Sequence, residues 1–193
     1  MALVLALLLS AVAPAGGTGV PVGASPFHRW GLSLGLGLDK QLFGPSSLSV
    51  DLEGTLRPLR HVRFGLIATA GWSPAPPADY PGRNATYRAL AVIDLVVPVA
   101  WGAFFFGLGG GIHHTNLLFD EFANEPAFRP RLQSWATGAT LVVRAGAEVL
   151  VRENVALGGS FALSVWANAP WIALNVYVLH PTLEARARVS VLF

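Results

Sequence analysis

The sequence predicts an all-β protein whose fold class is an eight-stranded antiparallel up-and-down transmembrane β-barrel. Three observations lead to this prediction. Segments in which polar and apolar residues alternate recur eight times, the connections between them are alternately long and tight, and 53% of the residues are hydrophobic while only 12% are charged. In soluble domains about a quarter of the residues are charged. We therefore expect much of the surface to face something other than water.

Each predicted strand has one polar and one apolar face, because successive strand residues point to opposite sides. In the first strand, residues 29–39, the apolar face begins with Trp30 and continues with leucines to Leu38. The other face has Arg29 and Asp39 at its ends and only glycine and serine between them. The same alternation predicts strands at 48–57, 61–72, 87–97, 103–113, 136–150, 155–166 and 183–193.

The connections between these strands alternate in length. The long ones are residues 39–47, 74–86, 114–134 and 167–182, and the tight ones are residues 58–60, 98–102 and 151–154. Short turns at one rim and long loops at the other are typical of up-and-down membrane barrels. An even number of strands places both ends of the barrel segment at the short-turn rim.

Alternation alone does not say which face is inside, since a soluble sandwich or a lipocalin-like barrel would bury the apolar face. The residue types favour the opposite arrangement. The polar face mixes glycine and serine with long charged side chains, whereas the apolar face is continuous leucine, valine and alanine with aromatic residues near its margins. The aromatic residues predict two girdles around a lipid-facing band. They are Trp30, Phe64, Phe104 and Phe193 near the short-turn rim, and Trp72, Tyr87 and Trp135 near the other.

Residues 89–112 allow a helical alternative, because they are apolar enough for a membrane helix and Asp94 is their only charged residue. Pro98 lies near the middle of this segment, and five glycines follow it. Proline and glycine disfavour a helix interior, and the period-two alternation of the first half favours a hairpin.

The amino-terminal residues predict export. Residues 2–13 form an apolar run too short for a comfortable transmembrane helix, and Ala13-Pro14-Ala15 provides a small-x-small cleavage pattern. We therefore predict a signal peptide at 1–15, a linker at 16–26 and a barrel domain at 27–193. The usual positive charge before the apolar run is missing, which leaves the true start codon open.

The last predicted strand, "LEARARVSVLF" (183–193), alternates polar and apolar residues and finishes with Phe193. This pattern resembles the carboxy-terminal signature of bacterial outer-membrane proteins. Together with the signal peptide, the eight strands and the loop alternation, it resembles the small eight-stranded outer-membrane barrels of the OmpA/OmpX type. The resemblance implies an outer-membrane location and contact with outer-membrane lipid and lipopolysaccharide. It also implies that the barrel-assembly machinery recognises Phe193 as an assembly signal.

The predicted lumen is rich in arginine and carboxylates. By strand parity, the inward-facing charged residues are Arg29, Asp51, Glu53, Arg57, Arg63, Arg88, Asp94, Arg144, Glu148, Glu184, Arg186 and Arg188. Guanidinium groups can pair with carboxylates bidentately, and side chains roughly fill the interior of an eight-stranded barrel. We therefore predict an internal ion-pair network that plugs the lumen of a structural or surface-interaction protein. A narrow channel that uses the same charges is an alternative.

A second alternative is a lipid A-modifying hydrolase. His113, Thr115 and Asn116 are similar to the His-x-Ser-Asn element of the outer-membrane lipid A deacylases, and a histidine two residues from a hydroxyl on one strand face can activate it. Threonine replaces serine, His113 points inward by parity, and the element lies far before the final strands. Neither Glu121 nor Glu125 has an established spacing for orienting the histidine. We therefore expect no enzymatic activity.

Other kinds of site find little support in the sequence. His113 and His114 are adjacent and face opposite sides of a strand, so we expect no metal site, and we expect no cofactor. The chain has no cysteine, and its net charge of +2 forms no basic patch, so we expect no nucleic-acid partner. The long connections 114–134 and 167–182 contain exposed apolar residues, which predicts a possible surface partner there.

Overall fold

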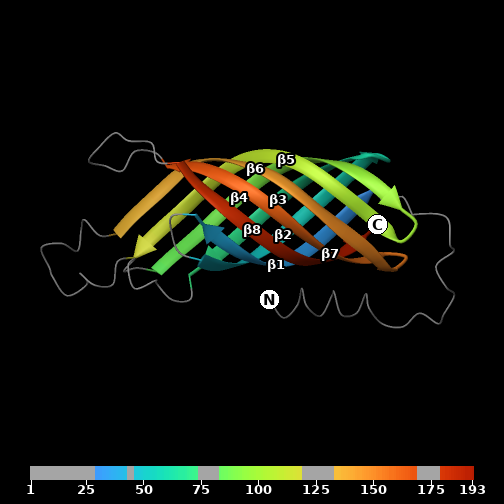
Figure 1. The fold of residues 1–193 in the computed structure, drawn as a ribbon, viewed down its shortest axis with the longest axis horizontal. Coiled ribbons are helices and arrows are strands. Elements are labelled where there is room, and N and C mark those ends of the chain that lie inside the picture. Colours follow the sequence, from blue (N-terminus) through green and yellow to red (C-terminus); the bar gives the residue numbers. More distant parts are fainter. Residues whose placement is uncertain (1–28, 43–45, 74–82, 119–132, 169–178) are drawn as a thin grey trace, which may run out of the picture.

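The computed structural model describes residues 29–42, 46–73, 83–118, 133–168 and 179–193. The predicted signal peptide (1–15) and linker (16–26) lie outside these residues, so both stay predictions. The described chain forms eight strands (Figure 1). They are β1 (Trp30–Gln41), β2 (Ser46–Leu59), β3 (Val62–Trp72), β4 (Arg83–Val99), β5 (Gly102–Leu118), β6 (Gln133–Arg152), β7 (Val155–Asn168) and β8 (Leu179–Leu192).

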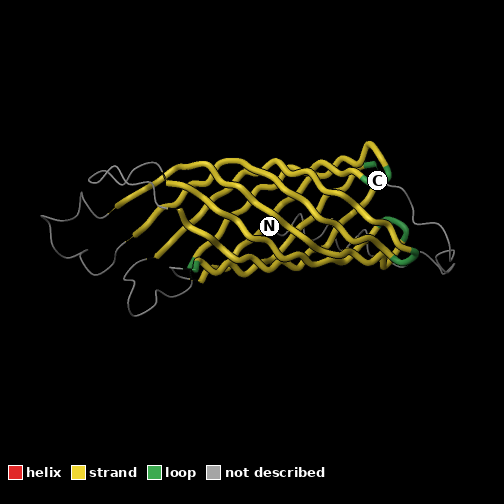
Figure 2. Tube along the Cα trace, turned by 45° about the horizontal axis from the view of Figure 1, so that its top comes forward, coloured by secondary structure: helices red, strands yellow, loops and turns green. Residues whose placement is uncertain are grey.

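The eight strands form one closed barrel in sequence order, and every neighbouring pair is antiparallel. The strands run obliquely around it (Figure 2). The first and last strands seal it in a continuous register from Gly31 opposite Leu192 to Gln41 opposite Thr182. Beyond this register, the Phe193 amide donates to the Trp30 carbonyl at 2.8 Å. Closure pairs the backbone groups of the two edge strands, which lipid could not satisfy.

Three hairpins have two-residue turns, at residues 60–61, 100–101 and 153–154, and these turns share one rim with the start of β1 and the end of β8. The three predicted tight connections are therefore confirmed. The predicted long connection 39–47 is wrong in its bounds, because β1 continues to Gln41 and β2 begins at Ser46, which leaves only residues 42–45 between them. The helical alternative for residues 89–112 is wrong, because Pro98 lies opposite Ala103 in the β4–β5 hairpin. None of the described residues forms a helix long and apolar enough to cross a bilayer.

Several strands are longer than predicted at the long-loop rim. β5 continues to Leu118, and β6 begins at Gln133, so the predicted loop 114–134 is too long. The predicted loop 167–182 is too long as well, because β7 continues to Asn168 and β8 begins at Leu179. Around His113, His114 and Thr115 both strand faces are polar. Alternation therefore stops while backbone pairing continues.

The distribution of side chains is that of a transmembrane barrel. Outward residues such as Leu66, Leu141 and Phe161 are at least 70% exposed, whereas the inward Glu53 and Arg63 are at most 6% exposed. The polar face therefore lines the lumen, as the residue types predicted. Of the predicted girdle, the exposed side chains are Trp30, Phe64, Phe104 and Phe193 near the short-turn rim and Trp72 and Tyr87 near the other.

One further aromatic residue joins the short-turn girdle. Trp101, in the turn between β4 and β5, is exposed and packs edge-on against Phe104 with ring centroids 5.6 Å apart. The sequence prediction missed it because it lies in a turn and outside the alternation. The side chain of the remaining predicted girdle residue, Trp135, lies outside the described part of the chain.

The seal between β1 and β8 can be tested with a disulfide, since the chain contains no cysteine. Leu34 lies opposite Val189, so the double variant Leu34→Cys/Val189→Cys should form a cross-link on mild oxidation. The matched pair Leu34→Cys/Leu66→Cys joins β1 to β3 and should stay reduced, because β2 lies between them. The measurement is gel mobility of folded protein with and without reductant. A cross-link in the control pair only would contradict the closed register.

Candidate functional site in the barrel lumen

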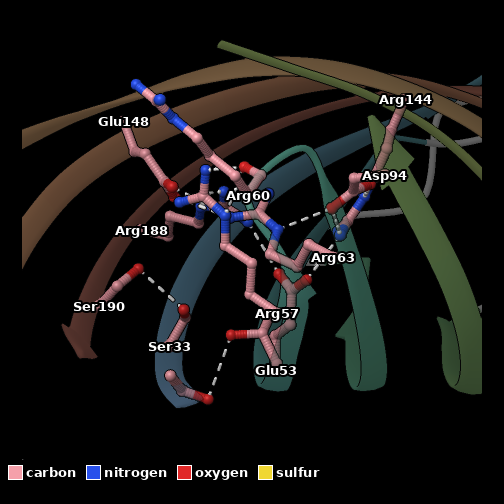
Figure 3. Close-up of polar contacts among 12 residues, drawn as sticks. Ser33, Glu53, Arg57, Arg60, Arg63, Asp94, Arg144, Glu148, Arg188 and Ser190 are labelled. Atoms are coloured by element: carbon pink, nitrogen blue, oxygen red, sulfur yellow. Dashed lines mark hydrogen bonds and ion pairs between the residues drawn. The ribbon is translucent and has the colours of Figure 1, made fainter. Parts of the chain in front are cut away.

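Six charged side chains near the short-turn rim form a closed ring, which we call the six-residue ring (Figure 3). Its members come from five strands, and arginine and carboxylate alternate around it. The successive ion-pair distances are Arg63 to Asp94 2.9 Å, Asp94 to Arg144 2.8 Å, Arg144 to Glu53 2.6 Å, Glu53 to Arg188 2.8 Å, Arg188 to Glu148 3.1 Å and Glu148 to Arg63 3.0 Å. Every charge has two opposite neighbours, and the ring has no formal net charge.

Phe105 on β5 packs against the six-residue ring. Its ring centroid lies 4.6 Å from the guanidinium carbon of Arg63, 4.4 Å from that of Arg188 and 5.5 Å from that of Arg144. These distances allow cation–π attraction, which is stronger away from water, and Phe105 is fully buried. Gly146 on the neighbouring strand makes room for it, because a Cβ atom there would lie 2.3 Å from Phe105 Cζ.

An apolar layer lies next in the lumen. Leu90, Val92 and Val142 are buried there, and Ile67 and Ala162 pack against them. Beside this layer is an internal cavity of about 40 Å³, whose wall also includes residues of the six-residue ring and of the charged cluster beyond it. A water molecule needs roughly 10–15 Å³ of such volume, so the cavity has room for only a few waters.

A second group of charged side chains, which we call the upper cluster, lies toward the long-loop rim. Its members are Asp39, Asp51, Arg88, Glu184 and Arg186. Arg186 contacts three carboxylates, at 2.9 Å from Asp39, 2.9 Å from Asp51 and 2.7 Å from Glu184. Arg88 forms a close ion pair with Glu184 and lies 3.5 Å from Asp39. Ser164 donates a further hydrogen bond of 2.5 Å to Glu184.

Ten of the twelve predicted lumen charges lie in these two groups. The other two, Arg29 and Arg57, lie at the short-turn rim, where Arg29 is exposed and Arg57 donates from Nε to the Arg60 carbonyl at 3.0 Å. Asp39 was missed because its segment was assigned partly to a loop, although it shares the parity of Gly35 and Gly37. The two groups therefore combine five arginines with six carboxylates, in place of the seven and five that parity predicted.

His113 and Thr115 lie inside the lumen near the long-loop rim, 3% and 1% exposed. His113 Nε2 is hydrogen-bonded to the Thr115 hydroxyl, and its imidazole stacks on Trp166 with ring centroids 4.0 Å apart. Trp166 Nε1 donates to the Thr182 hydroxyl at 3.3 Å. The inward direction of His113 agrees with parity. A histidine–hydroxyl pair of this kind can activate a nucleophile, but this pair faces away from the lipid side of the wall.

His114 does not join this pair. His114 points outward, where its Nδ1 is hydrogen-bonded to the Thr137 hydroxyl at 2.8 Å. The side chain of Asn116 and residues Glu121 and Glu125 lie outside the described part of the chain. Among the described residues, no group of three or more histidine, aspartate or glutamate side chains could hold a metal ion.

No protein-family model and no curated protein matches the sequence. Solved structures do match. The crystal structure of Neisserial surface protein A has a TM-score of 0.63 and 15% identity, over 85% of this chain and 96% of that one. Ail, the attachment invasion locus protein of Yersinia pestis, has a TM-score of 0.46 and 11% identity, over 83% of this chain and 95% of that one. A complex of Ail with the heparin analogue sucrose octasulfate has a TM-score of 0.43 and 12% identity, over 82% and 95%.

At such low identity the likeness to Neisserial surface protein A concerns the fold. The chain has the closed eight-stranded up-and-down fold of the small outer-membrane barrels, and the fold class predicted from sequence is confirmed. The predicted resemblance to barrels of the OmpA/OmpX type is confirmed at the same level.

The six-residue ring should contribute strongly to stability. Glu53→Gln would leave Arg144 and Arg188 each with one carboxylate partner fewer, and loss of one member of a buried ion pair costs about 3 to 5 kcal/mol. The free energy of unfolding should fall by about that amount in urea titrations of vesicle-inserted protein. Glu153→Gln, in an exposed turn, should change it by less than about 0.5 kcal/mol.

A double variant separates lost pairing from lost packing. Glu53→Gln/Arg188→Leu removes one charge of each sign, so its effect should be smaller than the sum of the two single effects. Strict additivity would contradict the ring.

Proposed function

We propose that this chain is a bacterial outer-membrane protein with a plugged lumen, which acts as a structural or surface-interaction protein. The observation that carries the proposal is the inverted distribution of polarity: an apolar, aromatic-bounded outer wall encloses layers of paired charges. The fold likeness to a protein named for its surface location is consistent with it. In such a location, outer-membrane lipid and lipopolysaccharide would contact the outer wall. The barrel-assembly machinery would recognise Phe193.

Successive side-chain layers support a closed lumen. The six-residue ring with Phe105 is followed by the apolar layer, the upper cluster and the stacked pair of His113 and Trp166. An ion entering from either rim would have to separate buried ion pairs, which is costly away from water. The internal cavity of about 40 Å³ leaves space for only a few waters between the two charged groups.

A closed lumen leaves the rims as the surfaces through which a soluble partner could be bound. At the long-loop rim, β5 stays paired with β4 and β6 as far as Leu118, whereas the register of β3 with β4 stops at Ala85. Similarly, β7 pairs with β6 only from Gly138 onward. The β4–β5–β6 group therefore projects beyond its neighbours. We propose that a soluble partner binds to this projection and to the long connections at the same rim, predicted at 114–134 and 167–182.

A role without catalysis agrees best with the position of the histidine–threonine pair. A lipid A hydrolase needs a nucleophile that reaches an acyl ester in the membrane, and Thr115 is 1% exposed in the lumen. Its neighbour His113 is buried and stacks on Trp166. We propose that this pair is part of the closure of the lumen.

The plugged lumen predicts the electrical behaviour of the purified protein. Wild type inserted into planar bilayers should show little or no steady conductance, because the charged layers leave no continuous water path. The measurement is single-channel recording. Stable, ion-selective steps in wild type, with a selectivity that changes in Glu53→Gln, would favour the channel alternative.

The proposed location predicts the accessibility of inserted epitopes. Outer-membrane barrels have their short turns in the periplasm and their long loops outside. An epitope inserted within residues 120–125 should bind antibody on intact cells, and one inserted at residues 152–153 should bind only after the outer membrane is permeabilised. The reverse pattern would contradict the orientation, and the same pattern for both sites would contradict the location.

A further inference from the structure

The upper cluster contains more negative than positive charge. Its three carboxylates, Asp39, Asp51 and Glu184, face two guanidinium groups, those of Arg88 and Arg186. With every group ionised, the cluster would have a formal charge of −1 inside the barrel. The neutral six-residue ring lies on the other side of the apolar layer. An uncompensated buried charge costs several kcal/mol, so such sites take up a compensating charge or neutralise themselves.

The three carboxylates differ in their contacts. Glu184 contacts both arginines and Ser164. Asp39 has an arginine within 3.5 Å of each oxygen, although its Oδ1 is buried and accepts no hydrogen bond from the described residues. Asp51 has a single ion-pair contact, 2.9 Å from its Oδ2 to Arg186 Nε. Its other oxygen, Oδ1, is buried and has no hydrogen-bond partner among the described residues, and the residue as a whole is only 8% exposed.

Asp51 also lines the internal cavity of about 40 Å³. The opposite residue on β3, Thr69, lies on the same wall, and its hydroxyl is a hydrogen-bond partner of the Asp51 carboxyl group. A metal ion is a poor candidate for the missing positive charge, since the described side chains provide no suitable group of three ligands. A proton on Oδ1 removes the surplus charge and leaves Oδ2 free to accept from Arg186.

We propose that Asp51 is a proton-binding site within the lumen and that it is protonated at neutral pH in the folded barrel. The charged groups that line the same cavity are Glu53 on β2, Arg144 on β6, and Glu184, Arg186 and Arg188 on β8. Asp39 on β1 and Arg88 on β4 contact Glu184 or Arg186, and His113 on β5 lies opposite Arg88. Of these groups, Glu53, Arg144 and Arg188 belong to the six-residue ring, whose six charges together are neutral, so the proton compensates the upper cluster alone.

Infrared spectroscopy tests the proposal directly. Folded wild type in detergent at neutral pH should show the C=O stretch of a protonated carboxylic acid, with the shift expected on deuteration, and Asp51→Asn should lack this band. Glu153→Gln should keep it. Absence of the band in wild type would overturn the proposal even if no variant folds. Persistence of the band in Asp51→Asn together with its loss in Asp39→Asn would assign the proton to another residue and overturn it as well.

Stability against pH provides a second measurement. An exposed aspartate in the unfolded chain ionises near pH 4, whereas Asp51 would keep its proton in the folded barrel. The quantity to measure is the unfolding equilibrium constant of wild type divided by that of Asp51→Asn. Above about pH 4 this ratio should rise by up to tenfold per pH unit. The rise should stop at the pH at which Asp51 ionises in the folded state. A ratio that is independent of pH would overturn the proposal. So would a wild-type stability that depends on sodium at constant ionic strength, because a metal cation would then provide the charge.

Discussion

The alternation of charge around the six-residue ring is the constraint on which the interior depends. An arginine inside a narrow barrel is favourable only when carboxylates replace its lost water, and here each guanidinium has two of them. The five contributing strands must therefore keep one register relative to each other, because a shift of one residue would turn a charged side chain toward lipid. The ring and the lipid-facing wall thus specify the same arrangement of strands from opposite sides.

Glycine and aromatic residues make this arrangement possible in so small a cross-section. Phe105 takes the place on β5 where a further charge would disturb the balance, and it presents its face to three guanidinium groups. Gly146 provides the space for its ring. On the other side of the apolar layer the balance is different, because two arginines face three carboxylates. The lumen is therefore built from two charged groups with different electrostatic character.

Strand parity accounts for most of what could be predicted. Alternation identified the strands, the inside face and ten residues of the charged groups, because it follows directly from backbone geometry. It did not identify which charges meet, since partners such as Glu53 and Arg188 are 135 residues apart and are brought together only by barrel closure. Parity also does not say where along the barrel axis a residue lies, so Arg29 and Arg57 at the rim were grouped with buried residues. Phe105 was not recognised as a lumen residue because the girdle argument considered only outward aromatic residues.

The seal between β1 and β8 has a consequence for the order of events in folding. β8 provides Glu184, Arg186 and Arg188, which contact residues of both charged groups. Until β8 is inserted, Glu53 lacks Arg188 and Asp51 lacks Arg186. Both charged groups are therefore completed only when β8 closes the wall, through contacts distant in sequence. Folds dominated by such contacts form slowly. In this barrel the final strand is the component that completes both the wall and the ion pairs inside it.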